Sequence, residues 1–248
     1  MSGRALDSPV ASMSRCKDAV MPERDVDGSR KVVEVREYEG EKSIALAATQ
    51  RGSVYSETRK RQIVDEWVEF FRSGPTPIRS LEFVSRTPKR LFAALSEQSQ
   101  LTALEVKWGD YDDLKVLSGM SELVTLRLRG ASGVQDLRPL AGLHTVKSLQ
   151  VEGLRGLVDA SPVGQMRSVT DLELGGNWMT PKNVRITSAA FLTRMPQLQS
   201  LLLHTLIVDD LDYHPLLSLP NLQEVRVMAA RGMAPPIGEL IDRLPWKA

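Results

Sequence analysis

The chain repeats one pattern of six residues along most of its length: an apolar position, two variable positions, an apolar position, one variable position and a last apolar position. The alternation at the end of each copy is typical of a short strand with one buried face. The copies start 22 to 29 residues apart, and self-similarity at a period of this size indicates a solenoid. Seven copies occur, and they begin at Ile78, Leu101, Leu123, Val146, Val169, Leu198 and Leu222.

The segments between the copies predict short helical turns that lead the chain back to the next strand. Residues 136–140 and 159–163 occupy the same place in consecutive turns, and each has Asp followed three positions later by Pro. Asp is suited to capping a helical turn, and Pro is tolerated in its first positions. Longer helices are expected at 89–97 and, after a cap at Ser188, at 189–195.

Both ends of the repeat array require a cap, because a terminal repeat leaves apolar core uncovered on one side. We expect residues 1–29 to form a flexible tail and residues 31–77 an N-terminal cap. In that cap, strands from Lys31 and from Ser43 are predicted to form a hairpin. A helix then follows Ser56 and stops at Gly74-Pro75. Its apolar face consists of Ile63, Val64, Trp67, Phe70 and Phe71.

The C-terminal cap is predicted at residues 236–248, after the repeats at 78–235. A short helix after Pro236 places Ile237, Leu240, Ile241 and Leu244 on one face. We expect this helix and Trp246 to cover the last repeat.

The seven copies resemble the leucine-rich repeat proteins, in particular the short-repeat class of bacterial internalins, over roughly residues 78–230. The resemblance implies an arc of about seven turns with a parallel β-sheet on its concave face, helical caps at both ends, and a role in binding proteins. The family usually places Asn or Cys three positions after the last strand residue. Here those positions hold Arg86, Gly109, Ala131, Leu154, Asn177, Leu206 and Ala230, so only Asn177 follows the family. The tight turn after each strand must therefore be held in another way.

The variable strand positions are expected to point out of the concave face and to contact a partner. They alternate in charge along the array, and three of them, Trp108, Arg127 and Arg129, are predicted to form the centre of a protein-binding site, because Trp and Arg dominate many binding interfaces. The alternative is a solvated sheet face whose opposite charges satisfy each other across strands. The candidate residues are Glu82, Glu105, Lys107, Trp108, Arg127, Arg129, Gln150, Glu152, Glu173, Leu202, His204 and Arg226.

A second candidate surface is the long turn that follows Gly175, which adds about six residues to the period and carries Trp178 and Met179. Insertions in repeats form loops, and loops often carry specificity. The alternative is a loop whose tryptophan folds back on the solenoid.

Composition narrows the classes of function. The net charge of +1 in 248 residues is spread over both halves of the chain, so we expect no binding to nucleic acid or to an anionic membrane surface. No apolar run approaches the length of a membrane span. The single cysteine, Cys16, excludes an intrachain disulfide, and no signal peptide is evident, so we expect a cytoplasmic protein.

The sequence offers no catalytic residue, metal site or cofactor motif. The histidines His144, His204 and His214 show no H-x-x-x-H spacing, and His214 lies beside acidic turn residues that need no metal. We therefore expect a non-enzymatic, monomeric scaffold that binds a protein partner as an adaptor or an inhibitor. Two other interpretations stay open: the repeats target a small functional N-terminal domain, or the chain is an exported bacterial effector.

Overall fold

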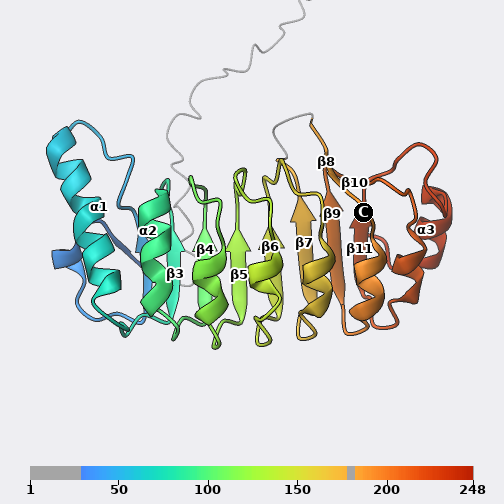
Figure 1. The fold of residues 1–248 in the computed structure, drawn as a ribbon, viewed down its shortest axis with the longest axis horizontal. Helices are drawn as coiled ribbons and strands as arrows, with labels where there is room; N and C mark the ends of the chain where they lie inside the picture. The colour runs from blue at the N-terminus through green and yellow to red at the C-terminus, as the bar shows by residue number, and fades with distance from the viewer. Residues whose placement is uncertain (1–28, 178–181, 248) are drawn as a thin grey trace, which may run out of the picture.

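The computed structural model describes residues 29–177 and 182–247, and it is a solenoid built on one long parallel sheet (Figure 1). Nine strands lie side by side, in the order β1-β2-β3-β4-β5-β6-β7-β9-β11. Their bounds are β1 (Arg30–Val32), β2 (Ser43–Leu46), β3 (Ser80–Phe83), β4 (Ala103–Val106), β5 (Thr125–Leu128), β6 (Ser148–Val151), β7 (Asp171–Gly175), β9 (Ser200–His204) and β11 (Glu224–Val227). A separate parallel pair is formed by β8 (Val184–Ile186) and β10 (Leu206–Val208).

The helical segments lie on one side of the sheet, which leaves its other face uncovered by helices (Figure 1). We call that uncovered side the open face. The α-helices are α1 (Glu57–Arg72), α2 (Lys89–Ala93) and α3 (Ile237–Arg243), and the remaining returns are 3₁₀ turns at Val35–Glu37, Ala94–Glu97, Lys115–Gly119, Arg138–Leu140, Ser161–Gln165, Ala190–Arg194 and His214–Ser218. The helix predicted at 89–97 is thus an α-helix that tightens into a 3₁₀ turn. In the described residues, no helix combines the length and the apolar composition needed to cross a membrane.

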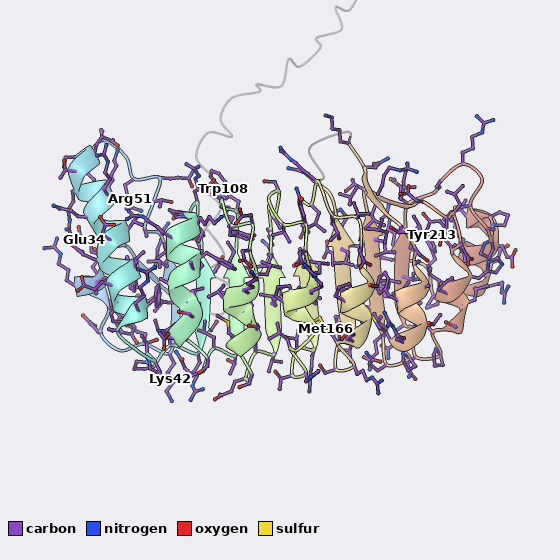
Figure 2. The ribbon with its side chains drawn as sticks, viewed as in Figure 1. Glu34, Lys42, Arg51, Trp108, Met166 and Tyr213 are labelled. Atoms are coloured by element: carbon purple, nitrogen blue, oxygen red, sulfur yellow. The ribbon has the colours of Figure 1, made fainter. Side chains whose placement is uncertain are left out.

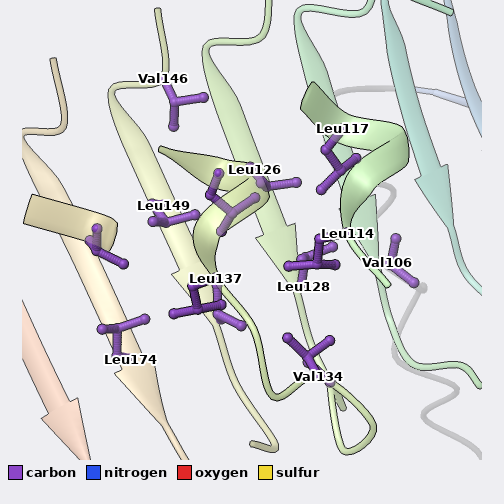
Figure 3. Close-up of a cluster of buried hydrophobic side chains, with 14 of the residues drawn as sticks. Val106, Leu114, Leu117, Leu126, Leu128, Val134, Leu137, Val146, Leu149 and Leu174 are labelled. Carbon is purple, nitrogen blue, oxygen red and sulfur yellow. The ribbon is translucent and has the colours of Figure 1, made fainter. Parts of the chain in front are cut away.

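The apolar positions of the repeat stack on their equivalents in the neighbouring turns. Leu126 of β5 lies opposite Leu104 of β4 and Leu149 of β6, and all three side chains are buried. Leucines from the return segments, such as Leu137, fill the space between the sheet and the helical turns (Figure 3). This continuous core confirms the solenoid that the repeat predicts.

The Asp residues lie one position before the N-cap of each return, at Leu137 and Ala160, and bond to the backbone N–H two residues on. The Asp136 carboxylate accepts a hydrogen bond from the Arg138 backbone N–H at 2.8 Å, and Asp159 does the same for Ser161 at 2.8 Å. Ser188 accepts from the Ala190 N–H at 3.1 Å. These side chains satisfy backbone donors that the first turn of a helix leaves without an intrahelical partner.

Backbone hydrogen bonds between neighbouring turns hold the bends where the family's Asn is missing. The Ala131 N–H donates to the Glu152 carbonyl at 2.7 Å, and the Leu154 N–H donates to the Gly175 carbonyl at 3.1 Å. The side chains of Ala131 and Leu154 are buried. An apolar residue therefore extends the core at this position, and the next turn supplies the hydrogen bond that a polar side chain would make.

The hairpin predicted at the N-terminus is wrong. β1 pairs with β2 in parallel, and β2 pairs in parallel with β3, so both strands continue the main sheet. The sheet accordingly has nine strands rather than about seven. The reason is that Ile44 and Leu46 take the places of the last two apolar positions of the repeat, opposite Leu81 and Phe83.

Helix α1 begins as predicted, with the Ser56 hydroxyl accepting a hydrogen bond from the Arg59 N–H at 3.1 Å. Its side chains Ile63, Val64, Trp67 and Phe71 are buried, and Phe70 is partly buried. The Trp67 Nε1–H donates to the Val33 carbonyl at 2.8 Å, which ties α1 to the chain just after β1.

A buried carboxylate also joins α1 to the first turn (Figure 2). Glu34 is 2% exposed and lies 2.7 Å from Nη2 of Arg59 and 2.6 Å from Nε of Arg36. The hydrogen bond from Arg59 is the main cause that holds the pKa of Glu34 below its ordinary value, with the charge of Arg36 acting in the same direction and desolvation opposing both.

The C-terminus covers the last strand of the sheet. The Val225 N–H of β11 donates to the Pro245 carbonyl at 3.0 Å, and the Lys247 N–H donates to the Val225 carbonyl at 2.9 Å. Trp246 packs on the core from this segment. An edge strand with unpaired backbone groups can pair with another chain, and this segment occupies that edge.

Candidate functional site

In each repeat copy, one variable residue lies between the last two apolar positions, and these residues stand in one row across the open face. Strand register places each one directly opposite the next, and the row reads Glu82, Glu105, Arg127, Gln150, Glu173, Leu202 and Arg226. The row forms because successive side chains of a strand point to opposite faces and the strands are in register. The sequence thus predicted the arrangement of this row.

Glu105 lies beneath Arg127 of the neighbouring strand β5 and Arg129, which directly follows that strand. Its side chain is 9% exposed, and its carboxylate lies 3.4 Å from Nη1 of Arg127 and 3.0 Å from Nη2 of Arg129. The arginine side chains are 36% and 43% exposed. The carboxylate therefore positions two guanidinium groups whose outer surfaces face solvent, and a partner would meet the arginines before it met Glu105.

Trp108 lies at the edge of the open face where the strands end (Figure 2). It is 37% exposed, and the guanidinium carbon of Arg86 lies 5.9 Å from the centre of its ring. Arg86 is itself paired with Asp110 at 2.7 Å. Gly130, which directly follows Arg129, gives the tryptophan room, since a Cβ there would lie 2.8 Å from the Cβ of Trp108. The structure thus brings Trp108 next to the turn that carries both arginines.

Acidic side chains and a histidine follow on the next strands. Glu173 of β7 lies 3.2 Å from Nε2 of His204, whose side chain is 2% exposed. The amide of Gln150 donates a hydrogen bond to Glu152. Burial raises the pKa of Glu152, and the charge of Glu173 raises it further, while His204, Arg129 and the hydrogen bond from Gln150 oppose the shift.

The C-terminal end of the open face is more apolar. A hollow of about 370 Å³ is lined there by Leu202, His204, Arg226, Met228, Ile237 and Trp246, among others. Ile237 and Trp246 come from the segment that the sequence predicts as a cap, so their place beside the contact row was missed. The signal that could have found them is their position immediately after the last repeat, next to its open face.

The remaining candidates are placed as follows. Lys107 is exposed and Glu82 is partly exposed on the N-terminal half of the face. Trp178 and Met179 lie outside the described residues. A second hollow of about 180 Å³ spans the middle of the face. Its lining adds the second variable residue of four repeat copies: Ser148, Asp171, Ser200 and Glu224.

Comparison with known proteins identifies the architecture. No family model matches the chain, and no curated protein matches it. Among solved structures, an internalin C2 from Listeria monocytogenes matches with a TM-score of 0.50 and 19% identity, over 73% of this chain and 72% of that chain. The chain has the leucine-rich repeat fold. Its parallel sheet alternates with short helical turns, which is the organisation that the resemblance to internalins implies.

Two longer leucine-rich repeat structures are similar to part of this chain. An internalin (inlF) of Listeria monocytogenes has 20% identity and a TM-score of 0.49, over 65% of this chain and 43% of its own. A leucine-rich repeat protein of Leptospira interrogans has 16% identity and a TM-score of 0.47, over 74% of this chain and 44% of its own. The chain therefore spans less than half the length of these two proteins.

Proposed function

We propose that this leucine-rich repeat chain is a non-enzymatic scaffold that binds a protein partner on its open face. The observation that carries the proposal is the fixed pair of arginines over Glu105, with the exposed Trp108 beside them. Leucine-rich repeat proteins generally act as binding scaffolds, and this group has the residue types that dominate interfaces. As part of the same proposal, the protein acts in the cytoplasm as an adaptor that recruits its partner or as an inhibitor that masks it.

Preorganisation supports this role. Long side chains lose rotamer freedom when they are immobilised in an interface, at about 0.5–1.5 kcal/mol each. Contact with the Glu105 carboxylate already restricts Arg127 and Arg129, so binding restricts them less. Arg127, Arg129 and Lys107 are interspersed with Glu82, Glu105 and Glu152, so this part of the face presents both signs of charge. A partner surface that also carries both signs complements it, and the apolar hollow near Leu202 accepts an apolar side chain.

The proposal predicts that the triple variant Trp108→Ala, Arg127→Ala, Arg129→Ala loses partner binding. Immobilised wild-type chain and triple variant are compared for proteins retained from lysate of the native cell, and affinity is then measured for each protein retained by the wild type. Removal of three central contacts is expected to weaken binding by at least about 100-fold, since each such residue typically contributes 1–2 kcal/mol or more.

The matched control is Lys115→Ala, Arg138→Ala, Val158→Ala, which removes two cations and one apolar side chain away from the open face, all of them exposed. This variant should bind as the wild type does. Equal loss in both variants, or no loss in the triple variant, would refute the open-face site. Circular dichroism checks that both variants are folded.

A further inference from the structure

Three potential metal ligands come from three neighbouring turns of the solenoid, whose strands β6, β7 and β9 lie side by side (Figure 1). Glu152 directly follows β6, Glu173 lies in β7, and His204 ends β9. Val151 is opposite Leu174, and Gly175 is opposite His204, so Glu152, Gly175 and His204 stand level with one another. Glu173 lies two residues before Gly175 and therefore on the same face of β7.

Gly175 creates the space into which these side chains lean. A Cβ on Gly175 would lie 2.5 Å from Cε1 and 2.6 Å from Nδ1 of His204, so the imidazole ring occupies the place of the missing side chain. From there the ring reaches Glu173, with 3.2 Å between Nε2 and Oε1. The histidine ring is thereby directed toward the carboxylates of the two adjacent strands.

The distances approach those of a metal site. One ligand atom from each of Glu152, Glu173 and His204 lies within 4.8 Å of the other two. Bonds of about 2.0–2.2 Å in a tetrahedral zinc site place neighbouring ligand atoms about 3.4 Å apart. The Nε2–Oε1 pair is already at 3.2 Å. The Glu152 side chain is partly exposed, and a change of its rotamer that releases the hydrogen bond from Gln150 would let its carboxylate approach the other two ligands.

Charge and orientation favour a cation here. Two carboxylates on neighbouring turns, partly withdrawn from solvent, repel each other, and a cation bound between them would relieve that repulsion. Nδ1 of His204 lies 3.3 Å from the Thr205 hydroxyl. When Nδ1–H donates to that hydroxyl, the lone pair of Nε2 points toward the carboxylates, which is the tautomer a metal requires.

We propose that Glu152, Glu173 and His204 bind one divalent transition-metal ion of the zinc type, with its remaining coordination positions open to solvent on the open face. Imidazole with carboxylates suits Zn²⁺ and its neighbours in the first transition row, whereas Ca²⁺ and Mg²⁺ prefer sites made entirely of oxygen ligands. The ion would link three consecutive turns of the solenoid and neutralise both carboxylates.

The test titrates ZnCl₂ into the chelator-stripped full chain by isothermal calorimetry at pH 7.5. All chains carry Cys16→Ser, so that the thiol does not contribute. We expect one equivalent of Zn²⁺ to bind, and we expect His204→Gln and Glu173→Gln each to weaken that binding at least about 10-fold, the minimum effect of disturbing a metal site. Visible absorption of bound Co²⁺ should be lost in the same variants.

The matched control removes the exposed histidine–carboxylate pair, His214 and Asp212, whose Nδ1 and Oδ1 lie 2.7 Å apart. Asp212→Asn with His214→Gln should leave Zn²⁺ binding unchanged. No Zn²⁺ binding in the parent chain, equal affinity in parent and Glu173→Gln, loss only in the control, or equal binding of Mg²⁺ would overturn the site. If His204→Gln does not fold, the partly exposed Glu152→Gln and Glu173→Gln decide. The measurement needs no partner, so its outcome is independent of the proposed protein binding.

Discussion

Replacing Leu126 with alanine is expected to lower the free energy of unfolding by about 2–5 kcal/mol. The side chain is fully buried on β5, between Leu104 and Leu149 of the neighbouring strands, and its truncation leaves a cavity in the middle of the stacked core. Rigid strands on both sides limit how far the core can collapse into that cavity. Chemical denaturation followed by circular dichroism measures the effect.

The control for this substitution is Val124→Ala, two residues earlier in the same turn. Val124 is 39% exposed, so its truncation should change the free energy of unfolding by less than about 0.5 kcal/mol. Equal effects of the two substitutions would contradict the account of a leucine core that runs through every turn.

Replacing Trp67 with alanine is expected to cost about 3–5 kcal/mol. Trp67 is fully buried in α1, and its ring centroid lies 5.3 Å from that of Phe70 and 5.4 Å from that of Phe71. The substitution also removes the donor to the Val33 carbonyl. We expect α1 and the first two strands to be stabilised together with the rest of the array, so that denaturation of the wild type shows one transition.

Gln62→Ala, at an exposed position of the same helix, is the control and should be near neutral. A separate early transition that Trp67→Ala lowers, with the main transition unchanged, would instead support the alternative in which residues 31–77 form a domain of their own. A change below about 1 kcal/mol would show that α1 contributes little to the fold.

The seven strands of the repeat were predictable because each one carries its own complete signal. Leu126 and Leu128 alternate with outward-facing Arg127, and the same alternation returns in every copy. A fixed period also sets the register between neighbouring strands, so the row from Glu82 to Arg226 could be predicted from the sequence. Local pattern and global fold agree at these positions, which is why the prediction succeeded.

The pairing of the first two strands was predicted wrongly because their repeat signal is partial. Ser43–Leu46 keeps only the last two apolar positions, and Arg30–Val32 has one buried side chain, Val32. Short apolar segments separated by a Gly-containing turn also satisfy the pattern of a hairpin. The difference between parallel and antiparallel pairing depends on long-range packing against β3, which no local pattern of residues 30–46 contains.

The contacts within the site were less predictable than its rows. The period predicts that Glu105 lies on the turn next to Arg127 and Arg129. It does not predict that the Glu105 carboxylate is buried beneath the two arginines. The ring of His204 leans over Gly175 because that position has no side chain, and the repeat pattern treats Gly175 only as a variable position. Such contacts depend on side-chain volumes and rotamers across strands.

Site-specific photo-crosslinking tests the central claim most directly. A photo-reactive amino acid is placed either at Thr125, a partly exposed position of β5 on the open face, or at Lys115, an exposed position on the helical side. Both chains are expressed in the native cell and irradiated. The account predicts a crosslinked protein adduct at Thr125 and none at Lys115. Adducts at Lys115 without any at Thr125 would contradict it.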